Sequence, residues 1–414
     1  MLQIDHVYEF LYQELFKDFD LYHLKDGVPK LKDVNINDIC LFTLGIETTE
    51  KIFFYDQEPL LVDTSDTYLD MFSYPTGYGV DEIIYLNSID QLPFNISKTP
   101  QHHIDFITNN QKCAYKLSST LVTSEKSSLL NSYLKKYKFH NLYYFFHGFA
   151  ALDWYRGFYA LNYNKSVIKD YTYDYITFNR LVSNDRSYRC YFVSLLAEHS
   201  LLTNGQVSFG LLTEQSSWQE EILNLNTNLS VTAINHIETY LPKKTLMINN
   251  EQVLGSASAD IPRCANDSLW HIVTETVFYY DKLHLTEKIF KPIVMKQPFM
   301  LLAAPGNLAY LKSYGFKTFE GIIDEGYDLI KDNDQRIEAV VAQLAWYCSL
   351  SAEEKQRVIE AIAPIVEYNF HHFYGEFKHI ITRELLDNTK QLFKEIGYDD
   401  SNVAYDDIYR VLTN

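Results

Sequence analysis

The sequence predicts an α/β protein with parallel sheets, two halves and a helical C-terminal segment. Three observations lead to this fold class. Short apolar runs that end in polar residues or glycine recur along the chain, which is typical of buried strands. A stretch with helical spacing separates two of these runs, and the order strand, helix, strand favours a parallel sheet. From Gln335 almost to the end, the spacing of apolar residues is helical.

Four apolar runs in the first 150 residues are expected to form strands. They cover residues 52–55, 83–86, 120–123 and 142–146. Between the last two, residues 126–137 place leucine and tyrosine side chains on one side of a helix. The polar stretch 162–174 is expected to be a linker.

The second half begins a new series of elements. Strands are expected at residues 175–178, 207–209, 269–275 and 299–303, and helices at 187–200 and from Thr286 onward. The turn Ala304-Pro305-Gly306-Asn307 follows the last strand, at the carboxyl end where open α/β sheets bind ligands. Ser351 and Glu354 form a capping box, and Gly375 marks a later helix boundary.

Length and composition set the limits of the interpretation. A chain of 414 residues exceeds the usual size of a single core, so we expect domains at residues 1–165 and 170–382 and a helical tail at 383–414. The net charge of −18 disfavours phosphate polymers and anionic membranes as partners. The five cysteines form no Cys-x-x-Cys pair, and neither a signal peptide nor a membrane span is indicated. These features predict a cytoplasmic protein.

The run His284 to Pro292 is the most informative motif. It places Glu287, Lys288 and Lys291 at the start of an otherwise apolar helix. A helix N-terminus offers free backbone N–H groups and a positive dipole end to a diphosphate, and the two lysines add cations. Glu287 would repel phosphate and is better suited to vicinal ribose hydroxyls. The alternative is ordinary helix-start chemistry, with Thr286 as the cap.

A wider pattern resembles a known family. Thr274-Glu275, then Thr286-Glu287-Lys288, Pro298 and Pro305-Gly306-Asn307 resemble the donor-binding region of family 10 fucosyltransferases. The resemblance covers residues 270–319. Phe299-Met300 stands where that family has Val-Val, and Leu285 and Ala304-Pro305-Gly306 match less closely. Similar segments occur in uncharacterised bacteriophage glycosyltransferases, including ones proposed to decorate modified DNA bases.

The resemblance implies the GT-B architecture, with two Rossmann-like domains, the first on the acceptor side and the second binding a nucleotide sugar. It implies that Glu287 binds the ribose, Lys288 binds a phosphate, and Arg186 or Arg189 neutralises the leaving diphosphate. Both arginines could equally be solvated residues at a helix start. The donor would be a UDP- or GDP-sugar, with no tightly bound cofactor and no metal. The predicted donor-binding residues are Arg186, Arg189, Thr274, Glu275, Thr286, Glu287, Lys288 and Lys291.

Transfer to an acceptor hydroxyl also requires a base, expected at a strand end of the first domain. The first candidate is Glu58, because the proline that follows it favours an extended backbone, and the second is Asp56. The third candidate is His147, next to Gly148, which allows the chain to approach a ligand closely. Structural turn roles remain open for all three. The pairs Asp18-x-Asp20 and Asp332-x-Asp334 match the motif of metal-dependent transferases, but neither follows a convincing strand, so we interpret both as solvated acids.

The leading hypothesis is therefore a glycosyltransferase that moves a sugar from a nucleotide sugar to a hydroxyl of a glycan or similar acceptor. One alternative is a phage-type enzyme, active in the host cytoplasm, that glycosylates a hydroxymethylated pyrimidine in DNA, with Lys126, Lys135, Lys136 and Lys138 as a basic face. Another is a non-catalytic carbohydrate-binding or structural protein, and a third is a metal-dependent GT-A transferase. The sequence leaves open the oligomeric state and whether the anomeric configuration is inverted or retained.

Overall fold

A computed structural model describes residues 7, 10–17, 19–23, 51–54, 119–137, 140–165, 170–182, 184–209, 228–241, 263–399 and 403–412. It is an α/β protein with two parallel sheets and a helical C-terminal segment, as predicted. The chain divides into two compact units. The first unit contains residues 2–146 and 381–414, and the second unit contains residues 147–380. Residues 147–165 thus belong to the second unit, and the expected C-terminal tail belongs to the first.

The first unit contains a parallel sheet with the order β1-β2-β3-β4. Its strands are β1 (Asp20–His23), β2 (Lys51–Phe54), β3 (Ser119–Thr123) and β4 (His140–Tyr143). Helix α6 (Ser128–Tyr137) connects β3 to β4, which confirms the predicted strand, helix, strand order. The expected strand at 83–86 lies outside the described residues. The remaining elements are a π-helical turn (Phe10–Leu15) and helices α17 (Lys378–Ile396) and α18 (Tyr405–Arg410).

The predicted strand at 142–146 needs a correction. Strand β4 ends at Tyr143, and helix α7 (Phe146–Trp154) starts at the last residue of the apolar run. Phe145 and Phe146 are both buried, although neither belongs to the strand. An apolar run reports burial and not backbone geometry, so it continues unchanged from a buried strand into a buried helix.

The second unit contains a parallel sheet with the order β6-β5-β7-β8. Its strands are β5 (Tyr173–Thr177), β6 (Gly205–Val207), β7 (Ser268–Thr274) and β8 (Phe299–Leu302). All four overlap predicted strands. The main helices are α8 (Phe158–Asn162), α9 (Tyr188–Glu198), α11 (Val231–Tyr240), α13 (Glu287–Val294) and α14 (Asn307–Ser313).

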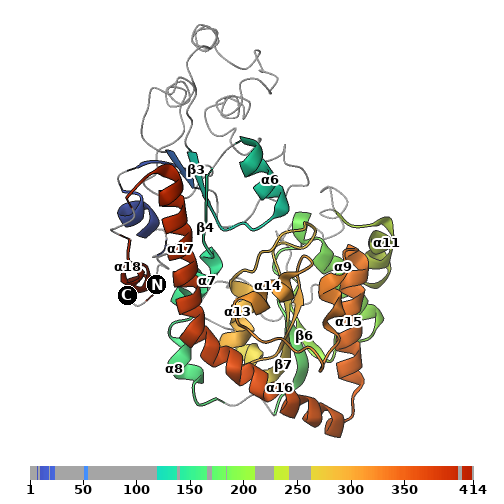
Figure 1. The fold of residues 1–414 in the computed structure, drawn as a ribbon. Helices are drawn as coiled ribbons and strands as arrows, with labels where there is room; N and C mark the ends of the chain where they lie inside the picture. The colour runs from blue at the N-terminus through green and yellow to red at the C-terminus, as the bar shows by residue number, and fades with distance from the viewer. Residues whose placement is uncertain are drawn as a thin grey trace. The chain divides into compact units, whose positions relative to one another are not determined.

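The strand order places helices on both faces of this sheet. Helix α9 leads from β5 outward to β6, whereas α13 leads from β7 outward to β8 in the opposite direction. Because such crossovers are right-handed, the two helices cover opposite faces. Figure 1 shows α9 and α11 on the same side as α15 (Asn333–Ser349), with α13 on the other side, and α9 packs against both α11 and α15.

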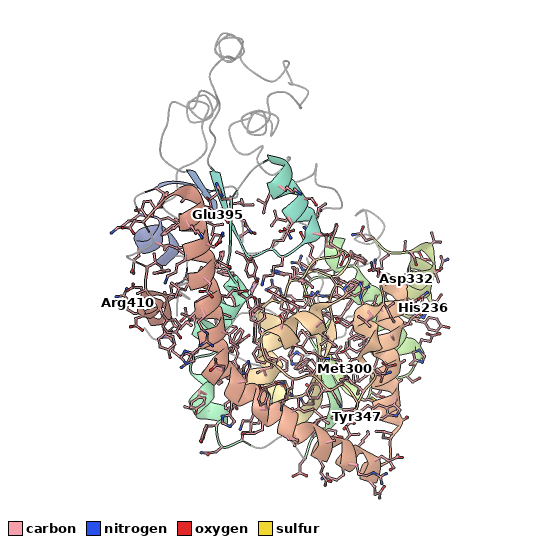
Figure 2. The ribbon with its side chains drawn as sticks, viewed as in Figure 1. His236, Met300, Asp332, Tyr347, Glu395 and Arg410 are labelled. Atoms are coloured by element: carbon pink, nitrogen blue, oxygen red, sulfur yellow. The ribbon has the colours of Figure 1, made fainter. Side chains whose placement is uncertain are left out.

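The core of the second unit is centred on β7, all seven residues of which are buried. The Trp270 ring has edge contacts with Phe319 and Tyr347, at centroid distances of 5.4 and 5.8 Å. Met300 of β8, labelled in Figure 2, is fully buried in the same sheet. Gly205 is required where the Tyr175 ring crosses β6, because a Cβ atom there would lie 2.3 Å from the ring.

Long helices form the C-terminal segment. Helix α15 is followed by α16 (Ala352–His372), and a π-helical turn (Phe373–Phe377) that contains Gly375 leads into α17. The predicted capping box is confirmed, because the Glu354 amide donates to Ser351 Oγ at 3.3 Å and the Ser351 amide donates to Glu354 Oε2 at 2.9 Å. None of the helices in the described ranges is both long and apolar enough to cross a membrane.

Candidate functional site

The strand order of the second unit contains a topological switch point, where successive strands change from one side of β5 to the other. After β5 the chain forms β6 on one side, and it then forms β7 and β8 on the other side of β5. Open α/β sheets bind ligands at such a point, outside the carboxyl ends of the two inner strands. Here the inner strands are β5 and β7, and Thr274, the last residue of β7, donates from Oγ1 to the carbonyl oxygen of Phe178 at 3.1 Å.

Glu275 follows β7 directly and joins this strand end to the start of α13. Its carboxylate accepts hydrogen bonds from the Thr286 amide (3.1 Å), from Thr286 Oγ1 (2.6 Å) and from the Thr276 amide (3.2 Å). Glu275 is completely buried. Burial raises the pKa of this carboxyl, and the Lys288 ammonium and the bonds from Thr286 oppose the increase. The carboxylate therefore acts as an internal support that places Thr286, the N-cap of α13, against the end of β7.

Lys288 is the cation of this helix start. Its Nζ lies within hydrogen-bonding distance of Thr276 Oγ1 (3.2 Å), Thr286 Oγ1 (3.1 Å) and Glu287 Oε1 (3.1 Å). Its side chain is 24% exposed, whereas that of Glu287 is 7% exposed. The ammonium is thus held in a defined position in the first turn of α13, and part of it can still be reached from outside the protein.

Glu287 lies between Lys288 and a histidine from α7. His147 Nδ1 is 3.5 Å from Glu287 Oε2, so α7 and α13 bring together two residues that are far apart in the sequence. Burial alone would raise the pKa of Glu287, but Lys288 and His147 lower it to about 2. The carboxylate is therefore ionised at neutral pH.

The structure adds two residues that sequence reasoning did not select. The His284 ring makes an edge contact with the His147 ring at a centroid distance of 5.1 Å, and the Tyr155 hydroxyl donates to the Glu287 carbonyl oxygen at 3.4 Å. Burial, reinforced by His147 and Lys288, lowers the pKa of His284 well below its ordinary value, so this imidazole is neutral. The only signal in the sequence was the position of His284 two residues before the helix cap.

The predicted phosphate-binding arginines lie in different environments. The Arg189 guanidinium is buried and donates to the carbonyl oxygens of Leu181 (2.8 Å), Thr274 (2.7 Å) and Glu275 (3.3 Å). It therefore clamps the carboxyl end of β7 to the segment that follows β5. Arg186 is half-buried in the 3₁₀ turn Asn184–Arg186. Lys291 is also buried, with Nζ 5.3 Å from the centre of the Phe178 ring.

The turn after β8 differs from the start of α13. Gly306 has a φ of 84°, a left-handed conformation that favours glycine. The Asp328 carboxylate accepts from the Leu308 and Ala309 amides at 3.0 and 3.3 Å, so an internal anion already occupies the N-terminus of α14. The N-terminus of α13 therefore differs from that of α14, because it carries the Lys288 ammonium.

The acidic pairs have structural partners where the chain is described. Asp332, labelled in Figure 2, caps α15 by accepting from the Gln335 amide at 2.9 Å, and Asp334 accepts from the Ser230 hydroxyl. No group of three or more His, Cys, Asp or Glu side chains within the described ranges could hold a metal ion.

Two of the candidate bases, Asp56 and Glu58, lie outside the described residues. At the carboxyl end of β3, the next strand in the first sheet, Glu125 is buried and accepts a hydrogen bond from the Ser127 hydroxyl.

Lys126, one of the four lysines of the expected basic face, donates to Glu384 at 2.8 Å and lies 3.9 Å from the centre of the Tyr143 ring. This member of the expected basic face is therefore engaged within the first unit.

Comparison of the chain with models of protein families, with curated proteins and with solved structures finds no match.

Proposed function

We propose that this protein is a glycosyltransferase of the GT-B type, which takes a sugar from a nucleotide sugar and transfers it to an acceptor hydroxyl. The observation that carries the proposal is the position of the Lys288 ammonium. It lies in the first turn of α13, and this helix start is hydrogen-bonded to the carboxyl end of β7, at the topological switch point of a parallel sheet. This edge of the sheet is where the fold class binds nucleotides.

The chemistry of the helix start suits a leaving diphosphate. When the bond between the sugar and the diphosphate breaks, negative charge grows on the leaving oxygen, and a cation fixed before the reaction stabilises that charge. Lys288 supplies the cation, and the positive end of the α13 dipole adds to it. Because Thr276, Thr286 and Glu287 already orient the ammonium, little rearrangement is required when the donor binds.

Glu287 fits the ribose. Its ionised carboxylate has about four acceptor positions. Lys288 Nζ donates to Oε1 at 3.1 Å, and His147 makes an ion-pair contact with Oε2 at 3.5 Å. The acceptor positions that remain match a pair of vicinal hydroxyls. The acceptor hydroxyl would lose its proton to a separate base, for which Glu58 and Asp56 remain the candidates, because His147 is already paired with Glu287.

A binding panel tests this proposal. Binding of GDP, UDP, GDP-fucose and UDP-glucose to the full chain is measured by isothermal titration calorimetry, and we expect at least one of them to bind. Lys288→Met should weaken that binding at least tenfold, because it removes the positive charge at the helix start that stabilises the diphosphate. Lys355→Met is the matched control, since it removes another partly buried lysine, paired with Asp174 at the opposite edge of the same sheet, and should leave nucleotide affinity unchanged.

Two results would overturn the proposal. One is that none of the four nucleotides binds at millimolar concentration. The other is that Lys288→Met and Lys355→Met bind the nucleotide equally well. If a nucleotide sugar binds without being hydrolysed or transferred to any glycan, the result favours a non-catalytic binding protein.

A further inference from the structure

A second polar site lies at the other edge of the same sheet. A cavity of about 680 Å³ is formed by the segment before β5, the turn before β6 and the first turns of α16. Strands β5 and β6 are parallel, so these segments lie at their amino-terminal ends. The cavity is therefore at the edge opposite to Lys288, and its volume is typical of small-molecule sites, which range from roughly 300 to 1,000 Å³.

A fixed ion pair forms one wall of this cavity. Asp174 is 7% exposed, and Lys355 Nζ donates to both of its carboxylate oxygens, at 2.7 and 2.9 Å. The Asn204 side-chain amide donates to the same carboxylate at 3.3 Å. Three hydrogen bonds from two side chains thus hold the carboxylate in one orientation, and its charge is already balanced within the protein.

Neutral polar groups and an aromatic ring complete the lining. Thr172, Thr203 and Gln356 are exposed and present two hydroxyls and an amide. Tyr171 is half-buried, and its hydroxyl shares a hydrogen bond of 2.7 Å with the hydroxyl of Tyr347, which Figure 2 labels on α15. The Tyr171 ring is thereby fixed at the cavity wall.

The charges narrow the class of ligand. The lining of this cavity contains two aspartates, Asp170 and Asp174, and a single lysine, so its local charge repels phosphate and carboxylate groups. The ligand does not need a positive charge either, because Lys355 already neutralises Asp174. What remains is a set of hydrogen-bond donors and acceptors beside an aromatic ring. These are the groups that match the hydroxyls and the apolar ring face of a sugar.

We infer that this cavity is a binding site for neutral carbohydrate, separate from the proposed nucleotide site. A sugar hydroxyl can accept from Lys355 or Gln356 and donate to Asp174 or to a threonine hydroxyl, while the apolar face of the sugar ring lies against Tyr171. The inference does not depend on the proposed glycosyl transfer, because a binding protein without turnover would have the same site. If the transfer is correct, the site would hold part of a glycan acceptor away from the reaction centre.

Ligand-observed saturation-transfer NMR on the full chain tests the inference. The probes are maltotriose, cellotriose and N,N′,N″-triacetylchitotriose at millimolar concentration, with glucose 6-phosphate as the anionic comparison. We expect saturation transfer to at least one neutral trisaccharide and none to the phosphate. Thr203→Trp adds an indole to the cavity lining and keeps both Asp174 and Lys355, and it should reduce the affinity at least tenfold.

The control is Thr232→Trp, which adds the same side chain to an exposed position on α11 and should leave sugar binding unchanged. Lys288→Met should also leave it unchanged, so a failure of the nucleotide proposal and a failure of this inference give different results. The inference is overturned if no neutral trisaccharide receives saturation, if the phosphate binds equally well, or if Thr203→Trp binds like the wild type.

Discussion

Replacing Lys288 by methionine would test whether its ammonium keeps the buried Glu287 carboxylate ionised. Nζ lies 3.1 Å from Glu287 Oε1, and His147 Nδ1 lies 3.5 Å from the other oxygen. Burial favours a high pKa for this carboxyl, yet the two neighbours lower it from 4.5 to about 2. At about 1.36 kcal/mol per pH unit, that difference corresponds to about 3 kcal/mol. Because His147 supplies a share, we expect Lys288→Met to lower the free energy of unfolding by about 2–3 kcal/mol at pH 7.

The pH dependence has a defined sign. A carboxylate with a lowered folded-state pKa stabilises the fold fully above its unfolded value of 4.5, and this contribution is lost as the pH falls toward 2. The difference between wild type and Lys288→Met should therefore be largest at neutral pH and should narrow below pH 4.5. Adding Glu287→Gln removes the carboxylate that has lost its partner, so the double variant should recover at least half of the lost stability.

Urea unfolding followed by circular dichroism at pH 7 and pH 3.5 measures these differences. Arg410→Met is the control, because it removes a cation whose ion pairs with Glu14 and Asp407 are exposed, and it should leave the midpoint unchanged. Equal midpoints for Lys288→Met and Arg410→Met would refute this account of Glu287. It is also wrong if the double variant is no more stable than Lys288→Met alone.

Three further predictions concern the second unit. Gly205→Ala would place a methyl group 2.3 Å from the Tyr175 ring, so we expect a loss of about 1–3 kcal/mol in urea unfolding, and an unchanged midpoint would contradict the packing described above. Burial and the nearby Lys291 lower the pKa of His271 to about 3. The free energy of unfolding should therefore decrease as the pH falls from 6.5 toward 3, by up to about 1.4 kcal/mol per pH unit. His271→Leu should flatten that decline, and an identical slope would count against a neutral buried imidazole. Asp328→Ala removes the acceptor for two amides at the start of α14 and should destabilise the fold by about 1–2 kcal/mol, whereas Asp328→Asn should lose less if capping, and not charge, is the cause.

The predictions that the structure confirms rest on local patterns. Strand β3, helix α6, strand β7 and the capping box of Ser351 and Glu354 were predicted from periodicity and cap residues within short windows. The same patterns gave the parallel sheets and the helical C-terminal segment. They were misleading at residues 142–146, because burial continues from β4 into α7 while the backbone geometry changes.

The environment of the predicted site residues depended on contacts between distant parts of the chain. The motif showed that Glu287 and Lys288 begin a helix, but not that Glu275 supports the cap or that His147 lies beside Glu287. The residues around Arg189 in the sequence do not indicate that it is buried among backbone carbonyl groups. The residues around Asp328 likewise do not indicate that its carboxylate binds the N-terminus of α14.

The sequence by itself therefore determined the elements that have a clear local pattern, such as β3, α6 and β7, together with the parallel sheets and the charged start of α13. The tertiary structure alone decided which side chains are desolvated, which are paired and which ammonium remains accessible. The physical reason is that helix and strand patterns arise from neighbours along the chain, whereas desolvation and ion pairing depend on groups that folding brings within a few ångströms of one another.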